Sequence, residues 1–103
     1  MVIHNKAIRD KIPEIIKESG KNCNVKKLDN SEFLIRLEKK LVEELEEYQE
    51  SKNVEELADI LEVIYRISEL KGEVSDELDK IRQKKAEQRG KFDDNLFLVD
   101  SDK

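Results

Sequence analysis

Two adjacent segments carry apolar residues at helical spacing, and only three residues, 51–53, separate them. The first segment is expected to run from Asp29 to about Glu50, with apolar residues at intervals of three and four: Leu34, Leu37, Leu41, Leu45 and Tyr48. The second is expected to span about 54–71. Because residues 51–53 leave room only for a short turn, the sequence predicts an antiparallel helix hairpin.

Capping signals mark the ends of both helices. Asp29 with Glu32 forms a capping box at the start of the first helix. Asn53 with Glu56 is a possible capping pair for the second, and Gly72 follows its last apolar residue. Local sequence therefore predicts where this hairpin begins, turns and stops.

The second helix of the hairpin is apolar around most of its circumference. Its apolar residues are Val54, Leu57, Ile60, Leu61, Val63, Ile64, Ile67 and Leu70. A helix lying on one surface needs an apolar stripe of only ~100°. In a chain of 103 residues, we expect the second cover to come from another subunit, which predicts a homodimer or a larger homo-oligomer.

Weaker patterns flank the hairpin. On its N-terminal side, a short helix is expected at roughly 10–19, with Asp10 as its cap, Pro13 in its first turn and Gly20 as its stop. Residues 21–28 are expected to form an extended connector or a very short strand.

On the C-terminal side of the hairpin, a fourth helix is expected from Ser75 to Gly90. The tail that follows, 91–103, carries five apolar residues that we expect to dock on the bundle or on a neighbouring subunit: Phe92, Leu96, Phe97, Leu98 and Val99. Together the segments predict an all-α bundle of about four helices in a single domain, 1–103.

Composition narrows the class of protein. Charged residues make up 44% of the chain, and the net charge is −5, so no nucleic-acid polymer is expected as a partner. Cys23 is the single cysteine, which excludes an intramolecular disulfide and favours a reducing compartment. The sequence has no run of apolar residues long enough to span a membrane and no signal-peptide pattern. We therefore expect a cytoplasmic protein.

Two acidic pairs lie close to the predicted turn, Glu44 with Glu47 and Glu56 with Asp59. Each pair is spaced i, i+3, so its members share a helix face, and antiparallel packing would bring all four carboxylates together. Carboxylates that close do not all stay ionised without a cation. Oxygen-only ligands suit Mg²⁺ or Mn²⁺. The alternative is a solvated acidic face, since Glu is frequent throughout the chain.

Cations on the predicted helices offer candidate anion contacts. Lys85 and Arg89 share a face of the fourth helix with Leu78 and Ile81. The alternative is that both side chains extend into solvent. Near the N-terminus, the run 9–11 adds Arg9 and Lys11, and Arg9 could equally be salt-bridged to a neighbouring acid.

These motifs resemble a known superfamily. EExxE at 43–47 followed by ExxD at 56–59 resembles the MazG-type all-α nucleoside triphosphate pyrophosphohydrolases, which include phosphoribosyl-ATP pyrophosphohydrolase and the dimeric dUTPases. A small MazG-like subgroup is the most similar, through three runs that occur in its order: NKAIRDKIPEIIKESGK (5–21), EELADILEVIYRI (55–67) and KKAEQRGKF (84–92).

The resemblance implies Mg²⁺-dependent hydrolysis of a nucleotide at the α–β phosphate bond, giving a monophosphate and pyrophosphate. By motif it assigns the metal ligands Glu44, Glu47, Glu56 and Asp59, a supporting role or an extra ligand to Glu43, and phosphate contacts to Lys85, Arg89, Arg9 and Lys11. Glu47 or Glu43 would orient the attacking water or accept its proton.

The chain departs from the family pattern at two places. Only eight residues separate Glu47 from Glu56, fewer than in many members of the superfamily, and this bears on the nucleotide pocket and the substrate. Lys91 stands where the subgroup often has glycine before phenylalanine, and this bears on the turn there. Three functions stay open: clearance of non-standard nucleotides, hydrolysis of phosphoribosyl-ATP in histidine synthesis, and a non-catalytic metal-binding helical module.

Overall fold

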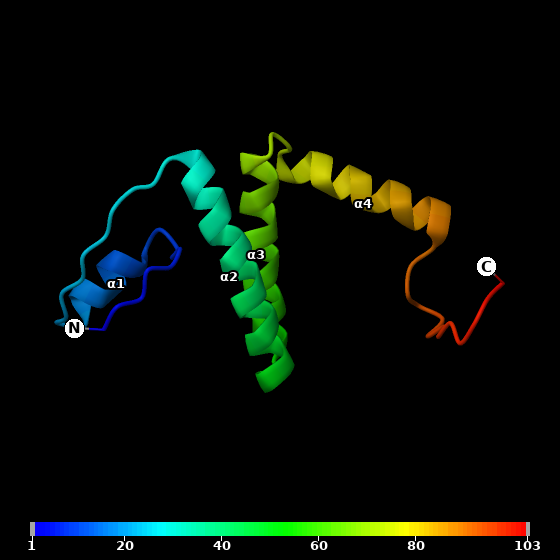
Figure 1. The fold of residues 1–103 in the computed structure, drawn as a ribbon, viewed down its shortest axis with the longest axis horizontal. Coiled ribbons are helices and arrows are strands. Elements are labelled where there is room, and N and C mark those ends of the chain that lie inside the picture. Colours follow the sequence, from blue (N-terminus) through cyan, green and yellow to red (C-terminus); the bar gives the residue numbers. More distant parts are fainter. Residues whose placement is uncertain (1, 103) are drawn as a thin grey trace.

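The computed structural model describes residues 2–102, apart from the side chain of Ser75, and the secondary structure of this part is entirely helical. Its four helices are α1 (Ile12–Glu18), α2 (Asn30–Ser51), α3 (Val54–Leu70) and α4 (Ser75–Arg89) (Figure 1). The prediction of an all-α chain with four helices is confirmed. Among the helices described, none combines the length and the apolar character needed to cross a membrane.

The hairpin of α2 and α3 is the centre of the fold (Figure 1). At the start of α2, the Asp29 side chain accepts a hydrogen bond from the Glu32 N–H at 2.8 Å. The helix ends in a left-handed residue, Lys52, with φ of 58°. The Asn53 side chain then accepts from the Glu55 N–H at 3.0 Å and so caps α3. The predicted hairpin and its bounds are confirmed to within one residue, and Asp29 and Asn53 cap its helices, although Asn53 bonds the N–H of Glu55 and not that of Glu56.

The hydrophobic core is small and lies between the two hairpin helices. Leu37 of α2 and Val63 of α3 are buried against Ala7 of the N-terminal segment, with four partly buried residues around them: Phe33, Leu41, Ile67 and Leu70. Ile60 of α3 is also buried. The N-terminal segment is irregular over residues 2–9, yet through Ala7 it belongs to the core.

Helix α1 begins later than predicted. Its N-cap is Lys11, and no side chain caps it, so the expectation that Asp10 caps this helix is wrong. The Ile12 N–H donates to the Arg9 carbonyl at 3.1 Å, which closes a turn ahead of the helix. Pro13 has no N–H, so it removes one of the donors that a cap would satisfy. The connector 21–29 forms no strand.

Helix α4 leaves the end of α3 and extends away from the hairpin (Figure 1). Among the described helices it contacts only α3. Residues 91–102 follow as an irregular tail in which Phe92 is 97% exposed and Leu96 to Val99 are almost as open. Docking of this tail on its own bundle is therefore wrong, because the hairpin lies at the other end of α4.

The molecule is correspondingly elongated. Its principal extents are 58 × 32 × 26 Å and its radius of gyration is 17.9 Å. A compact domain of this length has a radius of gyration of about 13 Å. The difference comes from α4 and the tail, which project from the hairpin instead of packing along it (Figure 1).

Candidate metal centre

The short turn between α2 and α3 brings the two acidic pairs to the same level of the hairpin. Only Lys52 and Asn53 lie outside the two helices there. The last turns of α2 therefore run beside the first turns of α3. Glu44 and Glu47 come from α2, and Glu56 and Asp59 come from α3, so the four acids approach one another across the helix–helix seam.

Three of these carboxylates converge. Glu44, Glu56 and Asp59 each offer one oxygen, and these oxygens all lie within 4.8 Å of one another. Glu44 is buried, with 6% of its surface exposed, and the other two are half-buried. This spacing and the all-oxygen donor set fit a hard divalent cation. The prediction that these three acids lie together is confirmed.

The burial of Glu44 distinguishes this cluster from an ordinary acidic surface. Its Oε1 lies 3.6 Å from the Lys40 Nζ, one helical turn earlier. Its Oε2 is buried and has no hydrogen-bond partner. A buried carboxylate oxygen without a donor is costly. A cation held between Glu44, Glu56 and Asp59 would offset the charge of this buried carboxylate.

Burial and mutual repulsion oppose ionisation of two of the acids. The pKa of Glu44 is raised first by burial and then by the negative charge of Glu47, while Lys40 opposes the rise. The pKa of Glu56 is raised by partial burial and by the charges of Glu47 and Asp59. Excess negative charge is thus concentrated at one point of the hairpin, as expected of a site that takes up a cation.

Glu47 borders the converging group without belonging to it. Its side chain is exposed, and its charge contributes to the raised pKa values of both Glu44 and Glu56. Glu47 therefore lies near the cluster and is open to solvent. Glu43 faces another way, with its Oε1 3.6 Å from the Lys6 Nζ.

The N-terminal segment brings one cation, Arg9, to the acidic cluster. The Arg9 Nη2 donates to the Asp59 Oδ1 at 2.7 Å. Of the two roles left open for Arg9, the salt bridge to a neighbouring acid is the one present here. Lys6 and Lys40, which pair with Glu43 and Glu44, were missed by sequence reasoning. The i, i+4 spacing of Lys40 and Glu44 was a usable signal, whereas the approach of Lys6 depends on the tertiary fold.

The remaining predicted cations lie away from the cluster. Lys85 and Arg89 are exposed on α4, which extends away from the hairpin (Figure 1). Lys11 is exposed at the start of α1. Within one chain, therefore, Arg9 is the one predicted phosphate contact that the structure places against the acids.

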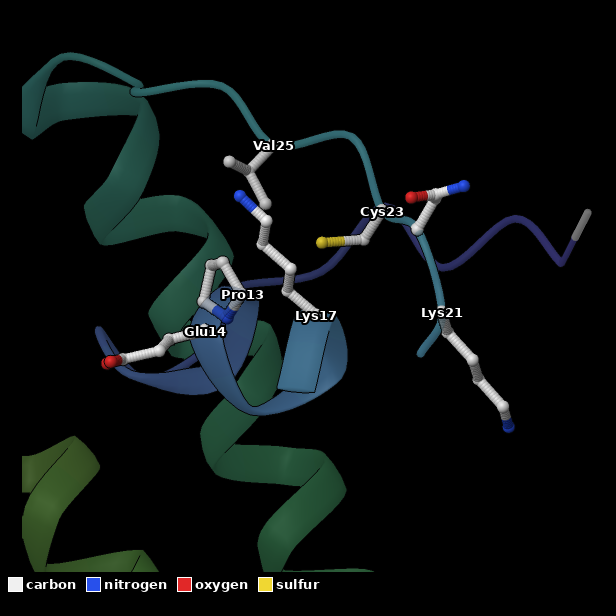
Figure 2. A pocket seen from close by; sticks show the side chains of 7 residues that line it. Pro13, Glu14, Lys17, Lys21, Cys23 and Val25 are labelled. Carbon is white, nitrogen blue, oxygen red and sulfur yellow. The ribbon is translucent and has the colours of Figure 1, made fainter. Parts of the chain in front are cut away.

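A pocket elsewhere on the molecule does not include the residues of the acidic cluster. It has a volume of about 540 Å³ and lies between α1 and the connector. Figure 2 shows Pro13 and Lys17 of α1 on one side and Cys23 and Val25 on the other, while the Glu14 and Lys21 side chains point outward. Its charged groups do not converge on a common point, so the acidic cluster is the stronger candidate site.

Comparison with known proteins adds no relative. No family model matches the chain, and searches of curated proteins and of solved structures found no similar protein.

Proposed function

We propose that this protein is a metal-dependent nucleotide pyrophosphohydrolase that cleaves the α–β phosphate bond of a nucleoside triphosphate. The observation that carries the proposal is the convergence of Glu44, Glu56 and Asp59, together with the burial of Glu44, whose Oε2 has no hydrogen-bond partner. The EExxE and ExxD motifs that supply these acids, at 43–47 and 56–59, support the same function through their resemblance to MazG-type enzymes.

The residues fit a resident Mg²⁺, with Mn²⁺ as the alternative. Glu44, Glu56 and Asp59 would hold it, and Glu47, which borders them, would be a further ligand. When bound, the ion would offset the charge of the phosphate oxygens and lower the pKa of the attacking water. Nucleotides and the acidic side chains are both negatively charged. Without the positive ion, the acidic cluster would therefore repel a nucleotide.

The side chains around the cluster can position the attacking water and contact the phosphate. Exposed Glu47 can orient a water and accept its proton, whereas Glu43, the second candidate by sequence, pairs with Lys6 instead. The Arg9 guanidinium already lies at the rim, on Asp59, where it can contact a phosphate oxygen. No covalent intermediate is required, because water is the nucleophile.

The first test is pyrophosphate release from a panel of standard and modified nucleoside triphosphates together with phosphoribosyl-ATP. Each is assayed with Mg²⁺, with Mn²⁺ and with chelator. We expect metal-dependent release from at least one group of substrates. Release from phosphoribosyl-ATP alone would favour the histidine-synthesis enzyme. Metal binding without release from any substrate would favour a non-catalytic metal-binding module.

Substitution of the buried acid separates a metal site from a crowded acidic face. Glu44→Gln is expected to lower turnover by roughly 100-fold, since even residues that only support metal ligands cost about 10- to 100-fold when changed, while the helical circular dichroism signal is retained. Because the substitution also removes a charge that is costly to bury, the metal-free variant should melt at a higher temperature than the metal-free wild type.

The matched control is Glu46→Gln, which makes the same chemical change at an exposed position of α2 outside the cluster. It should retain wild-type turnover and wild-type stabilisation by Mg²⁺. Equal stabilisation of Glu44→Gln and wild type by Mg²⁺ would contradict the metal site.

A further inference from the structure

Two protein cations lie against the candidate metal centre. The Lys40 Nζ is 3.6 Å from the Glu44 Oε1, one helical turn earlier on α2. The Arg9 Nη2, from the N-terminal segment, is 2.7 Å from the Asp59 Oδ1. Two of the three converging acids therefore each have one oxygen beside a positively charged side chain.

The pair of Lys40 and Glu44 is the most sheltered ion pair of the described residues. The Lys40 side chain is 17% exposed and the Glu44 side chain 8% exposed. In the other ion pairs of this part of the chain, the side chains are 37–70% exposed. Water and salt screen a sheltered pair less than an exposed one, so Lys40 acts more strongly on its partner than a surface lysine does.

Glu44 depends on this lysine as long as no metal is bound. Its Oε2 is buried and has no hydrogen-bond partner among the described residues, and Lys40 opposes the rise in the pKa of its carboxyl group. Loss of one partner of a sheltered pair leaves the other charge uncompensated in a place where water is scarce. Lys40 is therefore the counter-ion that lets Glu44 stay ionised in the metal-free protein.

The charge of the cluster matches one divalent cation. When ionised, the four acids assigned as metal ligands carry four negative charges, and Lys40 and Arg9 offset two of them. Glu43 adds no net charge, because Lys6 pairs with it. One ion of charge +2 balances the remainder, whereas a second ion would leave an excess of positive charge before any substrate binds.

The positions of the two cations work against a second ion for the same reason. Two divalent ions in one site lie about 3.5–4 Å apart, so they need carboxylates that bridge them with both oxygens. Glu44 and Asp59 are candidates for such a bridge, but Lys40 lies beside one oxygen of Glu44 and Arg9 beside one oxygen of Asp59. Each of these carboxylates therefore has only one oxygen that is not paired with a protein cation.

We propose that Lys40 and Arg9 are resident counter-ions that limit the candidate metal centre to one divalent cation per chain in the absence of nucleotide. Lys40 has a second effect as a positioning residue, because it holds the Glu44 carboxylate in place before the ion arrives. The inference rests on the metal site of the proposed function and is independent of hydrolysis.

The first test counts the bound ions. Mn²⁺ is titrated into the full chain at mildly alkaline pH, where carboxylates are ionised, and free Mn²⁺ is measured by electron paramagnetic resonance. We expect one ion per wild-type chain. The double variant Arg9→Gln/Lys40→Met, whose cluster carries four uncompensated charges, should bind two. Two ions on wild type, or one on the folded double variant, would overturn the proposal.

The matched control for this count is Lys17→Gln/Lys39→Met. It removes the same number of positive charges at exposed positions, one on α1 and one beside Lys40 in the sequence of α2. It should bind one ion, as wild type does. Two ions on this control would show that the net charge of the chain sets the number of ions, and this would overturn the role of the two resident cations.

The second test examines Lys40 without any metal. In chelator, Lys40→Met should lower the melting temperature by roughly 4–8 °C, as loss of one modest ion pair does in a domain of this size. The same change in the Glu44→Gln background should have little effect, because the charge that Lys40 compensates is gone. Lys40→Arg, which keeps the charge, should retain most of the stability. Equal losses in both backgrounds would overturn the role of Lys40.

These measurements separate the inference from the proposed function. One bound ion and two on the double variant, without turnover of any nucleotide, would support the inference and count against the hydrolase. Turnover by a wild type that holds two ions without nucleotide would support the hydrolase and overturn the inference. A wild type that binds no ion would overturn both.

Discussion

Glu44 is costly to bury in the metal-free protein, and it is also a proposed metal ligand. Its buried Oε2 has no hydrogen-bond partner, and its Oε1 lies 3.6 Å from the Lys40 Nζ. The sequence allowed Glu44, Glu47, Glu56 and Asp59 to be grouped, because i, i+3 spacing and a short turn are local properties. It did not allow Glu44 to be singled out as the buried member, since burial depends on how α2 and α3 pack.

Acidic pH is expected to stabilise the metal-free cluster. The pKa values of Glu44 and Glu56 are raised in the folded protein by burial and by neighbouring acids. A carboxyl group with a raised folded pKa favours the folded state below its unfolded pKa, about 4.3 for Glu, and this contribution is lost as pH rises through the folded pKa. Other carboxylates titrate in the same range, so the quantity to follow is the difference between wild type and Glu44→Gln.

The measurement is the unfolding midpoint of both proteins in chelator as pH increases from about 4 to 8, a range that brackets the ordinary carboxyl pKa. Wild type should lose stability relative to Glu44→Gln as pH rises, and Mg²⁺ should reverse that loss in wild type only. A difference between the two proteins that stays constant with pH would contradict the raised pKa of Glu44.

Arg9 is a counter-ion of Asp59. A metal ion bound by Asp59 would therefore compete with Arg9 for the same carboxylate. Removing it by Arg9→Gln should cost little stability, because exposed ion pairs contribute about 0.2–1 kcal/mol. The same change should tighten Mg²⁺ binding by roughly two- to fivefold and raise the KM for nucleotide. Calorimetry and steady-state kinetics measure the two effects. Lys17→Gln on α1 is the control, and weaker Mg²⁺ binding by Arg9→Gln would contradict competition for Asp59.

At the scale of elements, prediction succeeded where the signals are short-range. Asp29 and Asn53 cap the hairpin helices as single residues do in many proteins, and the two segments were delimited to within one residue. Prediction failed at Asp10, where a turn closed by Arg9 and Ile12 replaces the side-chain cap. A capping residue marks a helix start through a hydrogen bond from its side chain to an N–H of the first turn, and no side chain makes such a bond at α1.

The two caps provide a comparison between stability and site geometry. Asp29→Ala and Asn53→Ala should each destabilise the protein by about 1 kcal/mol, since each leaves one backbone N–H without its side-chain acceptor. Only Asn53→Ala should also weaken Mg²⁺ binding, because Asn53 begins the turn of α3 that carries Glu56. Denaturant unfolding and metal titration of both variants measure this, and equal metal affinities would contradict the role of the turn.

At the scale of the whole molecule, the chain has too little core for its length. The apolar circumference of α3 predicted a cover on two sides, and the structure supplies one side from α2. The direction of α4 and the open tail were not predictable, because Leu78, Ile81 and Phe92 specify that a partner surface is needed without specifying where it lies. The pairing of Lys6 with Glu43 was not predicted either, because it also depends on the tertiary fold.

Removal of residues 91–103 is expected to leave the fold of one chain unchanged. Phe92 and the apolar residues after it are exposed and lie away from the hairpin, so their loss should change the unfolding free energy of the hairpin by no more than about 0.5 kcal/mol. Far-ultraviolet circular dichroism should show the same helical signal for residues 1–90 as for the full chain. Loss of helix on truncation would mean that the tail supports the hairpin.

The connection between α2 and α3 sets the number of residues between the two acidic pairs. Lys52 adopts the left-handed conformation that ends α2, and Asn53 caps α3. An added residue must therefore enter a helix, where it turns everything beyond it by about 100° and takes Glu56 and Asp59 off the seam. A longer loop normally costs little free energy. Over this stretch, the length of the chain is under stricter constraint than the identity of most of its side chains.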